Sequence, residues 1–221
     1  MSNTDQTGAW RNPSGFQDAE ATNNKRSVRR YTDLDLFFGT NNKNKDINTL
    51  TDVQASTYTV RNATTGTVAD NLALAVVDLK DSSGTADTIT INLDNRQTGT
   101  VAANQNNFTI AALTAAGVEI ATINATKASS EGTAEDITVT AFNAVDLESL
   151  TLTGDADLKI DNALDDEAVT VNAGAFTGAL DLLHGTSALT YTGGTGADTI
   201  RFAADDLTTT DTITGGAGSD E

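Results

Sequence analysis

Residues 193–201 read Gly-Gly-Thr-Gly-Ala-Asp-Thr-Ile-Arg. They match every fixed position of the nonapeptide Gly-Gly-x-Gly-x-Asp-x-U-x, in which U is a large apolar residue. A second copy begins at Gly215 and runs to Glu221. The nonapeptide is a repeat unit of parallel β-helices, so this part of the chain predicts short strands that alternate with glycine-rich turns. In the first copy, Thr199 should point outward and Ile200 inward, because successive strand residues face opposite sides.

The residue types in this repeat suit a calcium ion. Glycine lets the backbone adopt crowded conformations in which carbonyl oxygens turn toward one point. The aspartate adds a charged oxygen, and calcium takes about six to eight oxygen ligands of these two kinds. One nonapeptide cannot close such a site, so a neighbouring turn must supply the other half. The alternative is a pair of Gly/Asp-rich turns between strands that hold no metal.

The two copies resemble the repeats of RTX-type calcium-binding surface proteins and, more closely, of bacterial S-layer-like proteins that carry scattered copies. The resemblance extends over residues 57–221 and implies Ca2+ as the cofactor. By this resemblance the ligands fall on Gly194, Gly196, Asp198, Gly216, Gly218 and Asp220. The copies start at Gly193 and Gly215, farther apart than one or two nonapeptides, so residues 202–210 should loop out or form an extra turn. Three further acids could complete either site, namely Asp205, Asp206 and Asp211.

The composition favours strands over helices. The chain has 221 residues, enough for a substantial core, yet only 38% are hydrophobic and 5% aromatic. Small apolar residues interspersed with threonine predict an all-β fold, either an irregular β-solenoid or β-roll or a β-sandwich of short strands. There is no cysteine, which excludes disulfides and thiolate chemistry.

Alternating apolar positions predict the strands themselves through residues 57–192. Residues 88–93 alternate cleanly, residues 72–79 are apolar enough for one buried strand, and residues 111–116 could form a helix or a strand. Six alternating triplets follow, at residues 137–139, 150–152, 158–160, 169–171, 180–182 and 189–191. We therefore expect a β-repeat body over residues 57–192, followed by calcium-binding repeats over residues 193–221. The second repeat stops before its apolar position, so we expect the chain to be part of a longer protein.

The charge is strongly acidic, with a formal net charge of −18. Residues 1–50 are nearly balanced, so the acid is concentrated in residues 51–221. Such a body repels nucleic acid, since phosphate binding needs basic surface. It also repels its own copies, which divalent cations would relieve, although a solvated surface explains the charge equally well. No apolar run approaches the length of a membrane span, and residues 1–25 lack the apolar segment of a secretory signal.

Residues 1–56 differ from the rest and predict an extended N-terminal arm that serves assembly. Trp10 and Phe16 lie in a polar segment, where they could dock on a neighbouring subunit or pack on their own domain. Residues 27–55 resemble the N-terminal stretch of the lysozyme-like wedge protein of contractile phage baseplates, with that family's first helix beginning near residues 52–55. The residues of this segment that we expect to serve assembly are Arg29, Arg30, Tyr31, Asp33, Asp35 and Phe37.

Catalytic constellations are not assembled in this sequence. His184 is the only histidine, and we expect it at the surface or in a turn. Paired carboxylates are frequent, but glycosidases hold such pairs across a sugar cleft, and the aromatic residues that line one are scarce here. We therefore expect a non-enzymatic structural protein of the extracellular space or cell surface, S-layer-like or adhesin-like. Calcium would rigidify its acidic repeats, and it would assemble with copies of itself or other structural subunits. The alternative is a virion structural component, a phage baseplate or tail appendage, anchored through residues 27–55.

Overall fold

The structure is a computed structural model that describes residues 25–27, 33–38, 47–53, 57–62, 70–72, 74–79, 81–96, 108–127, 137–164 and 170–221. Within these ranges every regular element is a β-strand, and every pairing between strands is parallel. The prediction of an all-β fold is confirmed. No helix in the described ranges is long and apolar enough to cross a membrane.

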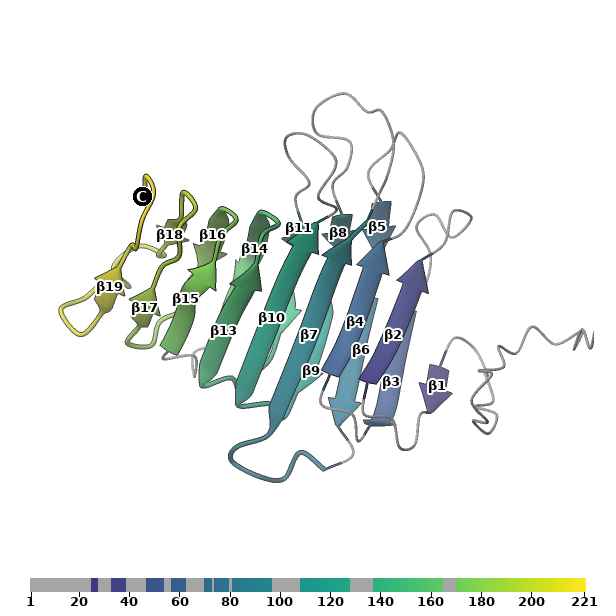
Figure 1. The fold of residues 1–221 in the computed structure, drawn as a ribbon. Coiled ribbons are helices and arrows are strands. Elements are labelled where there is room, and N and C mark those ends of the chain that lie inside the picture. Colours follow the sequence, from purple (N-terminus) through teal and green to yellow (C-terminus); the bar gives the residue numbers. More distant parts are fainter. Residues whose placement is uncertain are drawn as a thin grey trace, which may run out of the picture.

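The strands form three parallel sheets (Figure 1). The eight-stranded sheet contains β2 (Asp33–Phe38), β4 (Thr57–Asn62), β7 (Thr88–Asn95), β10 (Ile120–Lys127), β13 (Ser149–Gly154), β15 (Thr170–Phe176), β17 (Thr190–Thr192) and β19 (Thr212–Thr214). The six-stranded sheet contains β5 (Asp70–Leu72), β8 (Phe108–Ile110), β11 (Ile137–Val139), β14 (Leu158–Ala163), β16 (Leu180–Leu183) and β18 (Thr199–Arg201). The five-stranded sheet contains β1 (Lys25–Ser27), β3 (Ile47–Val53), β6 (Leu74–Leu79), β9 (Leu113–Ala116) and β12 (Phe142–Asn143).

The chain passes from sheet to sheet in a fixed order, and we call each circuit a coil. Strands β7, β8 and β9 lie in the eight-, six- and five-stranded sheets, and β10, β11 and β12 repeat that order and pair with them. From β13 to β19 the chain alternates between the eight- and six-stranded sheets alone. Parallel pairing from one coil to the next is typical of solenoid proteins, in which each repeat buries its apolar face against its neighbours.

Alternation placed most of the strands correctly, since each of the six triplets overlaps one of the strands β11 and β13–β17. The strand expected at residues 72–79 is confirmed as β6 over residues 74–79, whereas Leu72 ends β5, which belongs to a different sheet. The ambiguous run at residues 111–116 contains strand β9.

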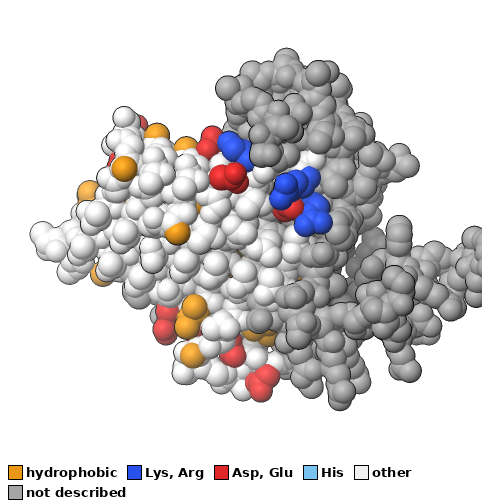
Figure 2. All heavy atoms as spheres, viewed as in Figure 1, with side chains coloured by type: hydrophobic (Ala, Val, Ile, Leu, Met, Phe, Trp, Pro, Cys, Tyr) orange, Lys and Arg blue, Asp and Glu red, His pale blue; other side chains and the backbone are white. Residues whose placement is uncertain are grey.

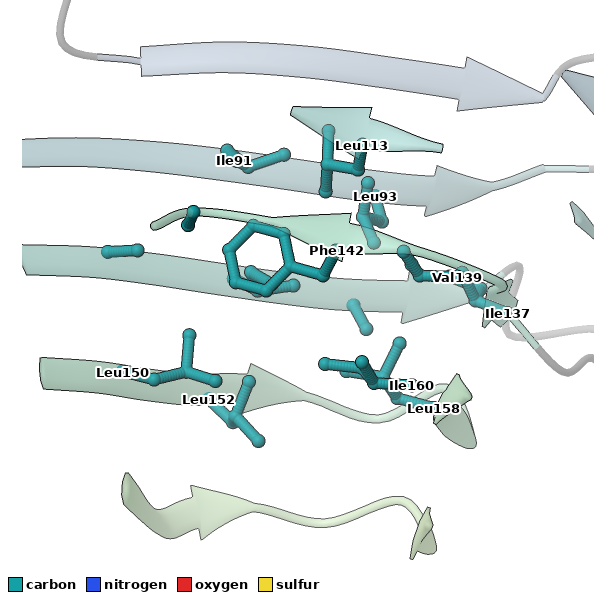
Figure 3. Close-up of a cluster of buried hydrophobic side chains, with 14 of the residues drawn as sticks. Ile91, Leu93, Leu113, Ile137, Val139, Phe142, Leu150, Leu152, Leu158 and Ile160 are labelled. Carbon is teal, nitrogen blue, oxygen red and sulfur yellow. The ribbon is translucent and has the colours of Figure 1, made fainter. Parts of the chain in front are cut away.

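The core is a continuous column of apolar side chains between the sheets (Figure 3). Ile91 of β7 and Leu150 of β13 point inward from the eight-stranded sheet, toward Phe142 of β12 and Ile160 of β14. All four side chains are buried. The inward positions are apolar and most of their neighbours along the strands are polar, with exceptions such as Val76 and Ile120, so the sequence alternation corresponds to the two faces of each sheet.

The segment predicted as an arm contributes three strands to these sheets. β1 pairs with β3, β3 with β6, and β2 with β4. Asp33, Asp35 and Phe37 lie in β2, in register with residues 57, 59 and 61 of β4. Residues 52 and 53 belong to strand β3, whereas the baseplate resemblance places the start of a helix at residues 52–55. The other predicted assembly residues, Trp10, Phe16, Arg29, Arg30 and Tyr31, lie outside the described residues.

Candidate functional site: the glycine–aspartate turns

The two nonapeptide copies lie in consecutive coils, one directly on the other. β17 precedes the first copy and pairs in register with β19, which precedes the second, so that Thr192 lies beside Thr214. The Gly193 amide donates to the Thr214 carbonyl at 2.7 Å, and the Ala217 amide donates to the Gly194 carbonyl at 2.9 Å. The spacing between the two copies is therefore the length of one coil, and residues 202–210 complete the path from β18 to β19.

Glycine is required where these turns pack on each other. A Cβ atom on Gly196 would lie 2.0 Å from the carbonyl oxygen of Gly178 in the preceding coil. A Cβ atom on Gly218 would lie 2.0 Å from the carbonyl oxygen of Gly196, and Gly218 also has a φ of 133°. Side chains are excluded by these contacts, and the backbone conformation of Gly218 disfavours them further. The glycines thus allow three successive turns to approach closely.

Asp198 is the most buried acid of the repeats, with 1% of its surface exposed. Its Oδ1 accepts a hydrogen bond from the Leu180 amide at 3.2 Å. Its Oδ2 accepts from the Gly194 amide at 3.0 Å and from the Tyr191 hydroxyl at 3.2 Å. A buried carboxylate is tolerated only when it is paired or hydrogen-bonded, and these three donors meet that need. The side chain connects its own turn, β17 and the preceding coil.

Asp220 repeats part of this arrangement one coil further on. Its Oδ1 accepts from the Asp198 amide at 3.1 Å, in the way that Asp198 accepts from Leu180, although Asp220 itself is exposed. Asp211 acts similarly before β19, where it accepts from the Leu189 amide at 2.8 Å and the Thr208 amide at 2.6 Å. In the turn stack, which we define as residues 193–198, 211 and 215–220, aspartates therefore bind backbone amides of the preceding coil.

These backbone hydrogen bonds have an effect on the titration of Asp211. The amides of Leu189 and Thr208 lower the pKa of its carboxyl group below the ordinary value of 3.8, because they stabilise the charged form. A carboxyl group whose pKa is lowered by folding stabilises the protein above its unfolded pKa. That contribution is lost as the pH falls through the lower, folded pKa.

The structure brings together two sets of predicted ligands, Gly194, Gly196 and Asp198 in one coil and Gly216, Gly218 and Asp220 in the next. The three other predicted acids, Asp205, Asp206 and Asp211, do not contact the glycine turns in the same way. Asp205 lies exposed in a turn with a φ of 71°, Asp206 follows it, and neither side chain hydrogen-bonds to the repeats in the described structure. Asp211 binds amides on the approach to β19 rather than the glycine turns.

The described geometry does not fit a calcium ion at Asp198. Calcium needs a shell of oxygen ligands, whereas two N–H groups and one O–H group point at this carboxylate. The Gly194 carbonyl also accepts an amide from the next coil. Among the residues that the structure describes, no three or more His, Cys, Asp or Glu side chains are grouped so that they could hold a metal ion. Calcium therefore stays a prediction of the sequence resemblance.

Two residues near the turns differ from expectation or were missed. His184, predicted at the surface or in a turn, has only 1% of its surface exposed, and its ring packs edge-on against Phe202 at 5.7 Å between centroids. Its Nε2 lies 2.7 Å from the Ser187 carbonyl oxygen, which suits a local bond in a tight connection.

The role of Tyr191 was missed. Its inward position in the 189–191 triplet was the available signal, but nothing in the sequence pairs its hydroxyl with Asp198.

The two buried tyrosines, Tyr58 and Tyr191, predict that the protein unfolds at alkaline pH as their hydroxyl groups ionise. Burial raises the pKa of Tyr58 to about 12, and burial together with the Asp198 carboxylate raises the pKa of Tyr191 from its ordinary value of 10.0. The stability that comes from keeping these phenols neutral is complete below about pH 10 and is lost as the pH rises toward the folded values. We expect phenolate absorbance and loss of far-UV circular dichroism to rise together above pH 10. Ionisation of both tyrosines with an unchanged dichroism spectrum would contradict the burial.

Comparison of the chain with models of known protein families, with curated proteins and with solved structures gave no match in any of the three. The fold defines an all-β protein of parallel sheets. Since one fold serves many functions, the function has to be argued from the turns and the surfaces.

Proposed function

We propose that this protein is a non-enzymatic structural protein of a cell surface or extracellular assembly, of the S-layer-like or adhesin-like kind. The main support for this proposal is that the aspartates of the turns accept hydrogen bonds from the backbone of the preceding coil. One apolar core runs through successive coils, and the acids of the turn stack accept hydrogen bonds that bind each coil to the preceding one. Such a body is suited to rigidity, because each repeat is stabilised by its neighbours.

The few basic residues support the same proposal. On the six-stranded sheet, Arg201 of β18 contacts Asp181 of β16 at 2.5 Å, and Lys159 of β14 lies 3.9 Å from the other oxygen of Asp181. On the eight-stranded sheet, Arg61 of β4 contacts Asp94 of β7 at 2.6 Å. The pairs of Asp181 are partly exposed and contribute little to stability, whereas Asp94 is buried. Their placement between coils favours a role in aligning the strands.

Assembly of copies requires relief of their mutual repulsion. The net charge of −18 opposes close approach, and divalent cations at the surface reduce such repulsion. Calcium, expected from the resemblance, is the cation that we include in the proposal, and extracellular modules bind it with dissociation constants of about 10⁻⁴–10⁻³ M. In this proposal calcium promotes contact between subunits and rigidifies the turns at their exposed acids, of which Asp220 is one.

The experiment compares the full chain in EDTA, in millimolar magnesium and in millimolar calcium. We expect calcium alone to raise the midpoint of thermal unfolding, since a ligand that binds only the native state stabilises it. We also expect calcium to produce larger particles in analytical ultracentrifugation. D220A should weaken the calcium effect, whereas D78A, which removes an exposed acid from β6, should not.

Equal responses to magnesium and calcium, or equal responses of D220A and D78A, would contradict a specific calcium role. A chain that stays monomeric in all three solutions would contradict the assembly role.

The virion alternative stays a prediction. Residues 33–38 and 47–53, which carry part of that resemblance, are strands β2 and β3 of the sheets, so a deletion of residues 1–55 would remove strands as well as an anchor. Substitutions at Arg29 and Arg30 are the more selective test. A virion anchor predicts that they abolish incorporation into particles, while the surface-protein proposal predicts that assembly of the purified chain is unchanged.

A further inference from the structure

The outward face of the eight-stranded sheet carries a regular array of hydroxyl side chains. Parallel pairing places the outward residues of successive strands in rows, and the register shifts only between β13 and β15, beyond Thr151. The first row is Thr88, Ile120, Ser149, Thr170, Thr190 and Thr212. The second row is Thr57, Thr90, Thr122, Thr151, Asn172, Thr192 and Thr214. The third row is Thr59, Asn92, Asn124 and Thr153.

The array is free of charge although the chain is strongly acidic. From β4 to β19, none of the three rows contains an Asp, Glu, Lys or Arg. Beyond the third row Arg61 lies in register with Asp94, and before the first row the chain carries Asp87, Glu119 and Glu148. In Figure 2 the face is largely white, and the red and blue side chains gather along its upper and lower margins. In a chain with a net charge of −18, this separation defines a distinct surface.

The spacing of the array is set by the backbone. Neighbouring strands of a sheet lie about 4.8 Å apart, and successive outward residues of one strand lie about 6.7 Å apart. Threonine is β-branched, so its side-chain rotation is restricted and its hydroxyl and methyl groups hold their places. The third row is fixed further by its own ladder, in which Asn124 donates to Asn92 at 3.2 Å and Asn92 donates to Thr59 at 3.3 Å.

The chemistry of the face argues against the usual macromolecular partners. Protein interfaces depend on aromatic and arginine anchors, and the three rows contain neither. Nucleic acids and anionic surfaces need basic residues, which are also missing from these rows. Sugar rings commonly stack on aromatic side chains, and the same rows offer none. What the face offers is a lattice of uncharged groups which, apart from Ile120, can each donate and accept hydrogen bonds with water.

We propose that this face binds ice, through water molecules held in lattice positions by the threonine hydroxyls and methyls. In the described structure, the threonine hydroxyls of the first two rows form no hydrogen bond with another protein group, so they are available to water. A regular array of small uncharged groups can share an ordered water layer with a crystal surface, whereas charged side chains would hold tight hydration shells of their own. This function does not rest on calcium or on assembly of copies.

The test uses the full chain in buffer with EDTA and measures partition into slowly growing ice together with thermal hysteresis. The wild-type chain should enter the ice fraction and depress the freezing point below the melting point. T122K and T151K place charge in the middle of the second row and should abolish both effects. T109K, which changes an outward threonine of the six-stranded sheet, is the matched control and should retain them. Circular dichroism melts show whether each variant is folded.

Exclusion of the folded wild-type chain from ice, to the same extent as an ordinary acidic protein, would overturn the proposal. Full activity of folded T122K and T151K would overturn it as well. If ultracentrifugation instead shows wild-type oligomers that T122K dissociates, while ice partition is absent, the face is an interface between copies and the proposal is wrong.

Discussion

Replacement of Asp198 by alanine should lower the free energy of unfolding by about 3–5 kcal/mol. The carboxylate is buried and accepts hydrogen bonds from Leu180, Gly194 and Tyr191. The alanine variant leaves two backbone amides and one hydroxyl without an acceptor, and each such buried donor costs about 1–3 kcal/mol. Urea unfolding followed by circular dichroism measures the loss.

The matched control for this variant is D220A. Asp220 occupies the equivalent position of the second repeat and accepts the Asp198 amide, but it is exposed to water. Its loss should cost about 1 kcal/mol, because water replaces the missing acceptor. The D198N variant should have a free energy of unfolding between those of wild type and D198A. Asparagine keeps one acceptor oxygen but turns its NH2 group toward a donor. If D198A and D220A lower the free energy of unfolding equally, burial of the Asp198 carboxylate has no energetic role.

Replacement of Gly196 by alanine should destabilise the protein by at least about 3 kcal/mol. The added methyl group would lie 2.0 Å from the Gly178 carbonyl oxygen and 2.5 Å from its carbonyl carbon. These are backbone atoms, so the contact can be relieved only by moving one coil away from the next. Such a movement would lengthen the hydrogen bonds between the turns. The same urea titration measures the effect.

The control for this variant is G174A in β15. Its added methyl group would meet the side-chain oxygen of Asn172 at 3.2 Å. That oxygen accepts a hydrogen bond from the Gly174 amide at 3.0 Å, but the side chain is exposed, so water can replace the bond if it turns aside. Both substitutions remove the same flexibility from the unfolded chain, so their difference isolates the contact between coils. G174A should change stability by no more than about 0.5 kcal/mol. A G196A variant as stable as G174A would contradict the close packing of the turns.

Much of the strand content could be predicted from local pattern. The triplets alternate because one side of each strand faces the core, and this constraint acts between immediate neighbours in the sequence. The course of the coils could not be predicted in the same way. Thr88 pairs with Ile120, but Thr190 pairs with Thr212, so the coil becomes shorter once the five-stranded sheet has ended. A period that changes along the chain is hidden from any search for a fixed repeat.

The two copies of the nonapeptide lie against each other, so each turn has the neighbouring turn that the motif requires. The hydrogen bonds that the Asp198 carboxylate makes could not be predicted from the motif. A Gly-Gly-x-Gly-x-Asp turn places the carboxylate close to its own Gly194 amide. The preceding coil then adds the Leu180 amide, and β17 adds the Tyr191 hydroxyl, and neither residue belongs to the motif. Whether the oxygens face a cation or protein donors depends on this packing, which only the three-dimensional arrangement supplies.

The most direct test of the account is amide hydrogen exchange of Leu180 and Gly194 in the full chain in EDTA, for wild type and D198N. If carboxylate–amide hydrogen bonds bind one coil to the next without metal, both amides should exchange slowly in the wild-type chain and faster in D198N. Fast exchange in EDTA that becomes slow only when calcium is added would contradict this expectation, because the turns would then be ordered by the ion and not by the Asp198 carboxylate.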